Sequence, residues 1–339
     1  MRLSRRQLLG VSAALGGLAG CNALPSGTDT STTPQSSSPT TAPGGPSVSW
    51  TAGPDLRRKR TQTTAVTLDG RIYVIGGITE ENATRAMAVY DPEANDWTDA
   101  TAPPKSVNHT AATVHDGRIH VFGGYTGSFL GTPPLDAHWI YDPTADSWSI
   151  GPPLPTARGA LVAVTVGDRL VTIGGATAND TVSTVEIYDP STQGWTTGES
   201  MPTAREHLSA GVIDDTVYVA GGRQGLGRMY TTTEAYDPAT DTWTAKASMP
   251  TARAGVAGSA LGDWLFVFGG EEIGRQVFEE VEAYDPDRDQ WYQVTPLPTP
   301  RWGIGVTTLD NRIYTVGGGA APSAEHTRTL EILTLTTEA

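Results

Sequence analysis

Six short apolar runs recur along the chain, and each run ends at a pair of glycines. The runs are IYVI at 72–75, IHVF at 119–122, LVTI at 170–173, VYVA at 217–220, LFVF at 265–268 and IYTV at 313–316. Each run is short and rich in β-branched and aromatic residues, so each predicts a strand that is buried on both faces. The glycine pairs are Gly76 and Gly77, Gly123 and Gly124, Gly174 and Gly175, Gly221 and Gly222, Gly269 and Gly270, and Gly317 and Gly318. Their near-regular spacing indicates one structural unit copied six times.

Each unit also carries the signals of two hairpins. Pairs such as Asp69-Gly70 and Asp116-Gly117 precede the apolar runs and predict tight turns onto an earlier strand. Most units then contain Tyr-Asp-Pro, which begins a turn, and a tryptophan seven residues after the tyrosine. The tryptophans are Trp97, Trp148, Trp195, Trp243 and Trp291. Four antiparallel strands in each unit predict the blade of a β-propeller.

The sixth unit ends without its tryptophan, and an unmatched tryptophan lies near the start of the repeats. Trp50 precedes Arg60 by ten residues, the same interval that separates the other tryptophans from the next arginine position. We therefore expect residues 48–51 to supply the outermost strand of the last blade. Such closure removes free sheet edges, and the predicted fold is an all-β, six-bladed propeller.

The combination of the glycine pair, Tyr-Asp-Pro, tryptophan and the arginine of Pro-Thr-Ala-Arg resembles the Kelch-repeat β-propeller family over residues 48–335. The resemblance implies that partners dock on one face, which is built from the loops after the glycine pairs and the loops that enter the first strands. The candidates that this implies here are Arg60, Gln62, His109, Tyr125, Arg158, Arg205, His207, Arg223, Arg253, Arg275, Arg301 and Trp302.

Two interpretations of the repeated arginines remain open. Arg60, Arg158, Arg205, Arg253 and Arg301 occupy one repeat position, where the second unit has a valine. A ring of guanidinium groups would suit a carboxylate or sulfate ligand. Repetition in register instead favours a structural role, with bonds to carbonyl groups or to a nearby glutamate such as Glu186, Glu234 or Glu282.

The positions that break the repeat are the better candidates for specific recognition. Two residues beyond the arginine position stand Gln62, His109 and His207, whereas the other units have alanine or glycine there. The two histidines belong to units two apart, so we do not expect them to share a metal ion, and no metal or other cofactor is predicted. Glu206 and His207 are neighbours, so on a strand their side chains would point to opposite faces. They are therefore poor candidates for a catalytic acid and base that act together.

Two classes of function are compatible with this pattern. The first is a non-catalytic module that binds a protein or a glycan. We favour it because the sequence shows no set of catalytic residues apart from the repeated positions. The second is a sugar enzyme, because the resembling family includes a sialic acid epimerase. Such a site would need acidic and basic groups to converge, and the available ones are Glu206, Glu271, Glu272, Arg223 and Arg275. A copper oxidase with a cysteine-linked tyrosine is excluded because the only cysteine is Cys21.

Composition narrows the class of partner. The chain of 339 residues has a formal net charge of -14. This charge opposes binding of nucleic acid and of anionic membrane surfaces, and we expect a monomeric propeller with an unknown protein or glycan as partner. The excess of acids and the scarcity of lysine resemble the proteins of salt-adapted organisms.

The first 47 residues predict an export signal followed by a linker. Arg5 and Arg6 precede an apolar stretch of about 12 residues, too short to span a bilayer, and the sequence Leu-Ala-Gly-Cys follows. Residues 1–21 resemble a twin-arginine signal with a lipoprotein box, which implies export, a lipid on Cys21 as the sole membrane anchor, and a place on the outer face of the membrane. Residues 22–47 form a Ser/Thr/Pro-rich tract that we expect to be disordered, before the propeller at 48–339. Asn82, Asn108 and Asn179 begin possible N-glycosylation sequons.

Overall fold

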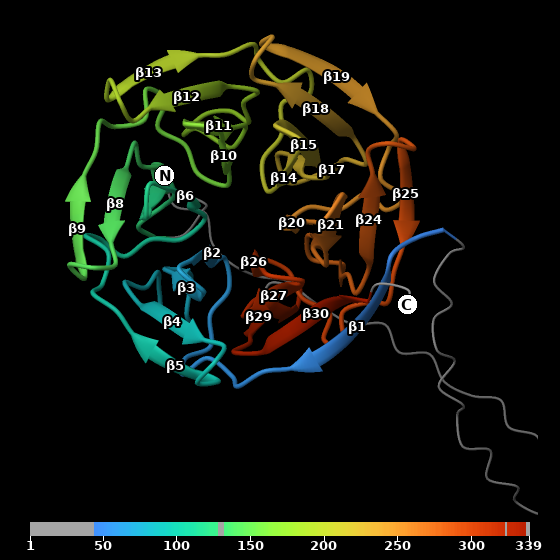
Figure 1. Cartoon of the computed structure of the whole chain (residues 1–339), viewed down its shortest axis with the longest axis horizontal. Helices are drawn as coiled ribbons and strands as arrows, with labels where there is room; N and C mark the ends of the chain where they lie inside the picture. Colours follow the sequence, from blue (N-terminus) through green and yellow to red (C-terminus); the bar gives the residue numbers. More distant parts are fainter. Residues whose placement is uncertain (1–43, 128–131, 323, 337–339) are drawn as a thin grey trace, which may run out of the picture. The chain divides into compact units, whose positions relative to one another are not determined.

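A computed structural model describes residues 44–127, 132–322 and 324–336 of the chain. These residues form six four-stranded antiparallel sheets that surround a central axis (Figure 1). The predicted six-bladed all-β propeller is therefore confirmed. The predicted signal, Cys21 and the predicted linker as far as residue 43 lie outside the described residues. Within the described ranges, no helix is long and apolar enough to cross a membrane.

The strands follow the predicted order in every blade. Blade 1 contains β2 (Thr64–Leu68), β3 (Arg71–Ile75), β4 (Met87–Asp91) and β5 (Asp96–Asp99). Blade 2 contains β6 (Ala111–His115), β7 (Arg118–Phe122), β8 (His138–Asp142) and β9 (Ser147–Ile150). Blade 3 contains β10 (Val162–Val166), β11 (Arg169–Ile173), β12 (Val185–Asp189) and β13 (Gly194–Thr197). Blade 4 contains β14 (Ser209–Ile213), β15 (Thr216–Ala220), β18 (Thr233–Asp237) and β19 (Thr242–Lys246).

The last two blades complete the ring, and three of the loops after the glycine pairs add small hairpins. Blade 5 contains β20 (Ala257–Leu261), β21 (Trp264–Phe268), β24 (Val281–Asp285) and β25 (Gln290–Gln293). Blade 6 contains β26 (Gly305–Leu309), β27 (Arg312–Val316), β30 (Leu330–Thr336) and β1 (Ser47–Ala52). The hairpins pair β16 (Arg223–Gln224) with β17 (Arg228–Met229), β22 (Glu271–Glu272) with β23 (Gln276–Val277), and β28 (Gly319–Ala321) with β29 (Ala324–His326).

The predicted closure of the ring by an N-terminal strand is confirmed. Strand β1 pairs antiparallel with β30, from Ser47 opposite Thr336 to Ala52 opposite Glu331. Trp50 packs edge-on against Phe268 of blade 5, with ring centroids 6.2 Å apart. The strand therefore completes blade 6 and also ties it to blade 5.

The glycine pairs have a geometric cause at the contact between neighbouring blades. Gly76 and Gly77 have φ angles of 61° and 105°, a region that favours glycine. A Cβ atom on Gly76 would lie 2.3 Å from the carbonyl oxygen of Val107 in the loop that enters blade 2. The amide of Gly77 donates to that same carbonyl at 2.8 Å. The doublet thus allows each blade to approach the next one closely.

In blades 1 to 5 the tyrosine and the tryptophan pack against each other, and the tryptophan links the blade to its neighbour. In blade 1 the ring centroids of Tyr90 and Trp97 lie 5.1 Å apart, and the tyrosine hydroxyl donates to Asn95 at 2.7 Å. The Trp97 indole N–H donates to the carbonyl of Pro54, which precedes blade 1 in the chain, at 2.7 Å. This repeated contact explains the fixed spacing of the two aromatic residues.

Candidate binding site at the mouth of the ring

The loops that enter the first strands meet around the axis in a closed belt of backbone hydrogen bonds. Each amide at the irregular position donates to the equivalent carbonyl of the preceding blade, over 2.7–3.4 Å. The belt runs through Gln62, His109, Ala160, His207, Gly255 and Gly303 and returns to Gln62. Every blade therefore presents one side-chain position at the mouth, at the same height along the axis.

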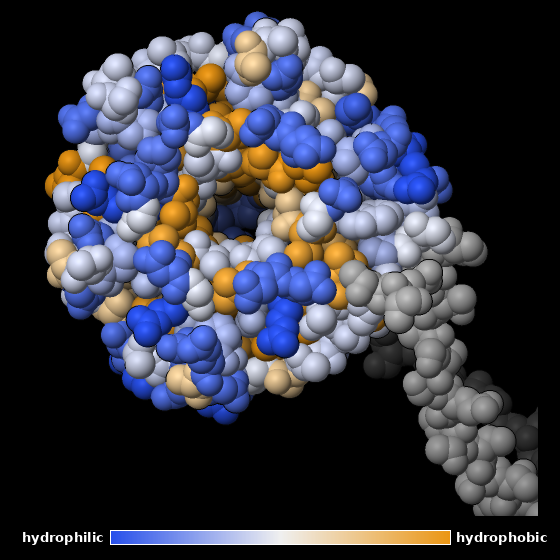
Figure 2. Space-filling model, in the orientation of Figure 1, coloured by the Kyte–Doolittle hydropathy of each residue, from blue (hydrophilic) through white to orange (hydrophobic). Residues whose placement is uncertain are grey.

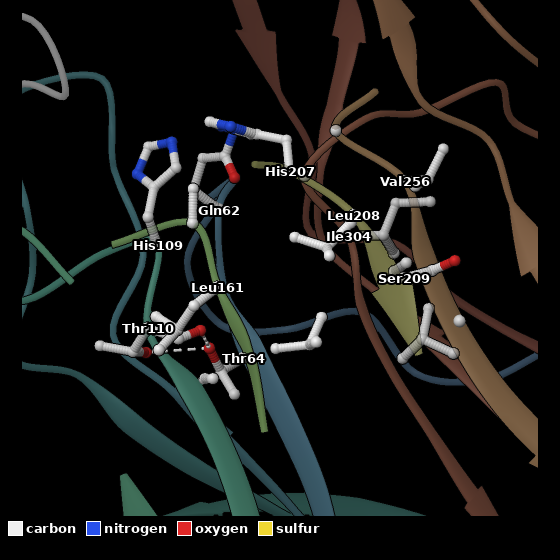
Figure 3. A pocket seen from close by; sticks show the side chains of 18 of the residues that line it. Gln62, Thr64, His109, Thr110, Leu161, His207, Leu208, Ser209, Val256 and Ile304 are labelled. Carbon is white, nitrogen blue, oxygen red and sulfur yellow. Dashed lines mark hydrogen bonds between the residues drawn. The ribbon is translucent and has the colours of Figure 1, made fainter. Parts of the chain in front are cut away.

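These belt positions have left-handed backbone conformations. The φ angles of Gln62, His109, Ala160 and His207 are 52–53°. A side chain in this region costs about 1 kcal/mol or more, so four of the six blades retain a strained residue where glycine would be relaxed. Beneath the belt lies a cavity of about 170 Å³, with Gln62, His109 and His207 at one end (Figure 3). Figure 2 shows the opening at the centre of the ring, with hydrophobic residues around it.

The expectation that His109 and His207 lie far apart is wrong. Their ring centroids are 4.9 Å apart and the rings meet edge to face. The belt has so small a radius that residues from blades 2 and 4 touch across it. Even so, the described residues contain no group of three or more His, Cys, Asp or Glu side chains arranged to hold a metal ion.

The expectation that Glu206 and His207 point to opposite faces is also wrong. His207 Nδ1 lies 3.4 Å from Glu206 Oε2. The alternation of side chains applies to extended backbone, and the left-handed φ of His207 interrupts it. The two side chains therefore belong to one buried cluster.

Arg223, on the hairpin that follows the fourth glycine pair, is the centre of this cluster. Its Nε donates to Glu206 Oε1 at 2.7 Å, and its terminal nitrogens lie 3.6 Å from Glu271 Oε1 and 3.5 Å from His207 Nε2. All four side chains are buried. Two carboxylates thus share one guanidinium group beside the mouth.

Burial determines the charges of the surrounding groups. Burial, and then repulsion from Arg223 and from His207 in its protonated form, hold the pKa of His109 well below its usual range. Burial and Arg223 likewise lower the pKa of His207, so both imidazoles are neutral at pH 7. For Glu206, burial raises the pKa, but His207 and Arg223 outweigh it and the net shift is downward. Burial raises the pKa of Glu271.

Neighbouring side chains define the orientation of the His109 ring. The buried Asn108 amide donates to the carbonyls of Tyr125 and Gly127 at 3.1 and 2.9 Å. Its Oδ1 therefore accepts a hydrogen bond from His109 Nδ1, which places the proton on that nitrogen. With its amide hydrogens engaged and no exposed surface, Asn108 is not accessible to a glycan, whereas Asn82 and Asn179 lie on exposed loop positions.

The repeated arginines lie inside the blades rather than at the mouth. Arg158 is fully buried, and it donates to the carbonyls of Gly174 and Thr184 at 2.7 and 2.9 Å and to Glu186 at 2.8 Å. The same ion pair occurs in three further blades, as Arg205 with Glu234, Arg253 with Glu282, and Arg301 with Glu331. Of the two interpretations of these arginines, the geometry supports the structural one.

Blades 1 and 2 depart from this arrangement in different ways. Arg60 donates only to backbone carbonyls, because blade 1 has Ala88 where four other blades have glutamate. Blade 2 has Val107 in place of the arginine and Trp139 in place of the glutamate, and both are buried in one apolar cluster. An apolar pair thus replaces the ion pair in blade 2, whereas Arg60 lacks a carboxylate partner among the described residues.

The other candidates are distributed over different surroundings. Tyr125 is buried, with its hydroxyl donating to the carbonyl of Ala176 at 3.2 Å, and Trp302 is half-buried, with its indole N–H donating to Ala321 at 3.0 Å. Arg275 is exposed and pairs with Glu272 at 2.7 Å, apart from the buried cluster around Arg223.

Sequence reasoning did not anticipate a crevice between the loops of blades 2, 3 and 4. Its volume is about 730 Å³. Its described lining includes Tyr125, Asn179, Asp180, Thr181, Glu206, Gln224 and Leu226. The Gly225 amide donates to Thr181 Oγ1 at 3.3 Å and joins the rims of two blades. The adjustable loops after three successive glycine pairs therefore combine into one recess beside the mouth.

A family model for the KLHDC2/KLHL20/DRC7 Kelch-repeats domain matches residues 47–175 and 149–318. The chain is a Kelch-repeat protein. Kelch-like protein 35 of Mus musculus is 26% identical to this Kelch-repeat protein over 126 residues, which is 37% of the chain and 21% of that relative's length. The solved structure of YjhT superposes with a TM-score of 0.74 at 16% identity, over 84% of this chain and 98% of the other. That superposition shows a shared fold.

Proposed function

We propose that this Kelch-repeat protein is a non-catalytic binding module that holds a protein partner over the crevice of blades 2, 3 and 4. The observation that carries the proposal is the recess itself, which the loops of variable length build on one side of the mouth. Kelch propellers commonly bind protein partners, which supports a protein rather than a glycan as the ligand.

An exposed leucine supports the same location. Leu226 lies on the crevice rim with 55% of its surface exposed, and Ile150 at the end of the outer strand β9 is the other large hydrophobic residue with high exposure, at 79%, in the described part of the chain. An apolar side chain on the rim of a recess is a suitable anchor for a partner, because its burial contributes about 1.5–3 kcal/mol.

The sugar-epimerase alternative is not favoured. Of the five groups that such a site would need, Glu272 and Arg275 form a separate exposed pair. Glu206 and Arg223 are buried and bonded to each other beside Glu271. The comparisons give a Kelch fold, and a fold of this kind carries many unrelated activities.

We also propose that the protein is exported and held at the outer face of the membrane by a lipid on Cys21. The support is the order of signal features in residues 1–21. Metabolic labelling with a tritiated fatty acid, followed by fractionation, tests this proposal. We expect label in the full chain and none in the Cys21→Ala variant, which should also leave the membrane fraction; label that persists in the variant would contradict the anchor.

Site-specific photo-crosslinking in the native host tests the binding function. A photoreactive amino acid is placed at Leu226 in one full-length variant and at Ile150 in the matched control. We expect one discrete protein adduct from position 226 and none from position 150. Adducts only from position 150, an adduct with a glycan alone, or no adduct from either position would refute the proposed function.

A further inference from the structure

The cavity beneath the belt is a second candidate site, apart from the crevice. Its volume is about 170 Å³, and it shares no lining residue with the crevice. The lining contains no lysine, arginine, aspartate or glutamate, and burial keeps its two histidines, His109 and His207, neutral at pH 7. Alanine, valine, leucine and isoleucine form most of the wall, and a few hydroxyl groups interrupt it. Such a wall suits a small neutral molecule with an apolar part.

Gln62 is a polar group of this cavity whose hydrogen bonding is incomplete. It is 9% exposed, and its side-chain amide has no hydrogen-bond partner in the described part of the chain. The amide atoms are not fully enclosed by protein, and Gln62 lies at the upper end of the cavity in Figure 3. A buried amide without partners costs free energy, which a ligand with complementary groups would recover.

The neighbouring blade leaves space for this glutamine. A Cβ atom on Gly303 would lie 2.9 Å from the amide carbon of the Gln62 side chain, so a larger residue there would displace that side chain. The backbone N–H of Gln62 donates to the Gly303 carbonyl at 2.7 Å, which holds the two residues together. Gln62 has a φ of 53°, whereas blades 5 and 6 have glycine at the same position. Blade 1 therefore carries a glutamine where glycine would be less strained.

We propose that the cavity binds a small neutral molecule that carries a carboxamide group, with the Gln62 side chain as its recognition group. Two carboxamides can each donate to and accept from the other, so this ligand would satisfy both the oxygen and the nitrogen of the glutamine. Leu161, Val256 and Ile304 line the same cavity and suit the apolar part of the ligand. The opening at the centre of the ring provides the entrance (Figure 2).

Three compounds of similar shape test this preference. Isobutyramide donates and accepts hydrogen bonds, methyl isopropyl ketone only accepts them, and isobutyrate is charged. Each compound is titrated into the full chain, and the methyl signals of isoleucine, leucine and valine are followed by NMR. We expect isobutyramide to bind with a dissociation constant of about 1 mM and to shift the signals of Leu161, Val256 and Ile304.

The other two compounds should bind more weakly for different reasons. The ketone should bind about fivefold to tenfold more weakly, because it leaves the oxygen of Gln62 without a donor. Isobutyrate should not bind measurably, because no lining residue supplies a positive charge. Equal binding of the three compounds, or no shift of the cavity methyl signals with isobutyramide, would overturn the proposal.

Two variants locate the preference at Gln62. Gln62→Gly removes the amide and places at this position the residue that blades 5 and 6 carry there, so the belt should still form. The variant should bind isobutyramide no better than the ketone. The matched control Ala160→Gly makes the same backbone change in blade 3, where φ is also 53°, and should keep the preference for the amide.

Unfolding in urea separates recognition from a purely structural role. If Gln62 serves a ligand, the urea midpoint of Gln62→Gly should be no lower than that of Ala160→Gly, because both replace a strained residue with glycine. A clearly lower midpoint for Gln62→Gly, or an amide preference that survives in it, would contradict the assignment. A protein adduct at Leu226 is expected whether or not the cavity binds the amide, because the two sites share no lining residue.

Discussion

Arg60 is a buried arginine without a carboxylate partner among the described residues, and the other blades show which residue could supply one. Four blades neutralise the equivalent arginine with a glutamate, whereas blade 1 has Ala88 at that position. Arg60 is 2% exposed, and burial lowers its pKa to about 10. One pKa unit corresponds to about 1.4 kcal/mol, so a lowering of this size represents a cost of about 3 kcal/mol to the folded state.

The substitution Ala88→Glu supplies the missing carboxylate. Part of the cost of about 3 kcal/mol should be recovered, but the new group is itself removed from water, so we expect a net stabilisation of about 1–2 kcal/mol at pH 7. The backbone around Arg60 matches that around Arg158, since both side chains donate to the carbonyls 16 and 26 residues later in the chain. The side chain therefore has a precedent for its position.

Urea unfolding of the full chain, followed by tryptophan fluorescence, measures the effect. The matched control Ala88→Gln has the same size without the charge, and it should be less stable than the Glu variant by about 2 kcal/mol at pH 7. The difference should begin to shrink as the pH falls below about 4.3, the ordinary pKa of a glutamate, and should disappear only about one to two pH units lower, where the carboxyl is protonated in the folded protein too. A Glu variant no more stable than the Gln variant at pH 7 would refute the electrostatic reasoning.

Three further predictions concern the frame. Burial lowers the pKa of His120 to about 3 and of His138 to about 4, so below pH 6.5 the unfolded chain binds more protons than the folded one. Stability is therefore lost as the pH falls through 6.5, and at pH 5 the loss is about 4 kcal/mol. In His138→Asn the slope of unfolding free energy against pH should be about half as steep between pH 6.5 and 5, and an unchanged slope would contradict this. Trp50→Ala should cost about 3 kcal/mol in urea unfolding by weakening the closing strand, and a loss below about 0.5 kcal/mol would argue against closure. Glu186→Leu should lower the free energy of unfolding by about 3–5 kcal/mol because it leaves Arg158 without its carboxylate. Adding Arg158→Met should restore most of that stability, because an apolar pair then replaces the ion pair as in blade 2. If the single and double variants are equally unstable, an apolar pair does not substitute for the ion pair in blade 3.

The fold could be predicted in detail because its signals are local and repeated. The turn pairs, the tryptophan spacing and the glycine pairs each specify a short-range geometry, and six copies reinforce one another. Even the long-range closure could be inferred, because Trp50 has the interval of the other tryptophans. The structural role of the repeated arginines was one of two interpretations open from the sequence, and its glutamate partners lie 28 to 30 residues after the arginines.

The site was less predictable because it depends on distances across the axis. The contact between His109 and His207 results from the small radius of the belt and from their left-handed φ angles, and neither is encoded in residue spacing. The crevice depends on how three loops of unequal length fold toward one another. One signal for the blade 2 core was available: Trp139 stands where four other blades have glutamate, and its match with Val107 could have been found by aligning the repeats.

The central claim is that a protein partner sits on the loops of blades 2, 3 and 4. Hydrogen–deuterium exchange of the full chain, with and without the protein captured at Leu226, tests it most directly. The account predicts slower amide exchange in residues 176–181 and 223–229 and unchanged exchange in the outer strand β9 (Ser147–Ile150). Protection confined to the outer strands, with unchanged exchange around the crevice, would contradict it.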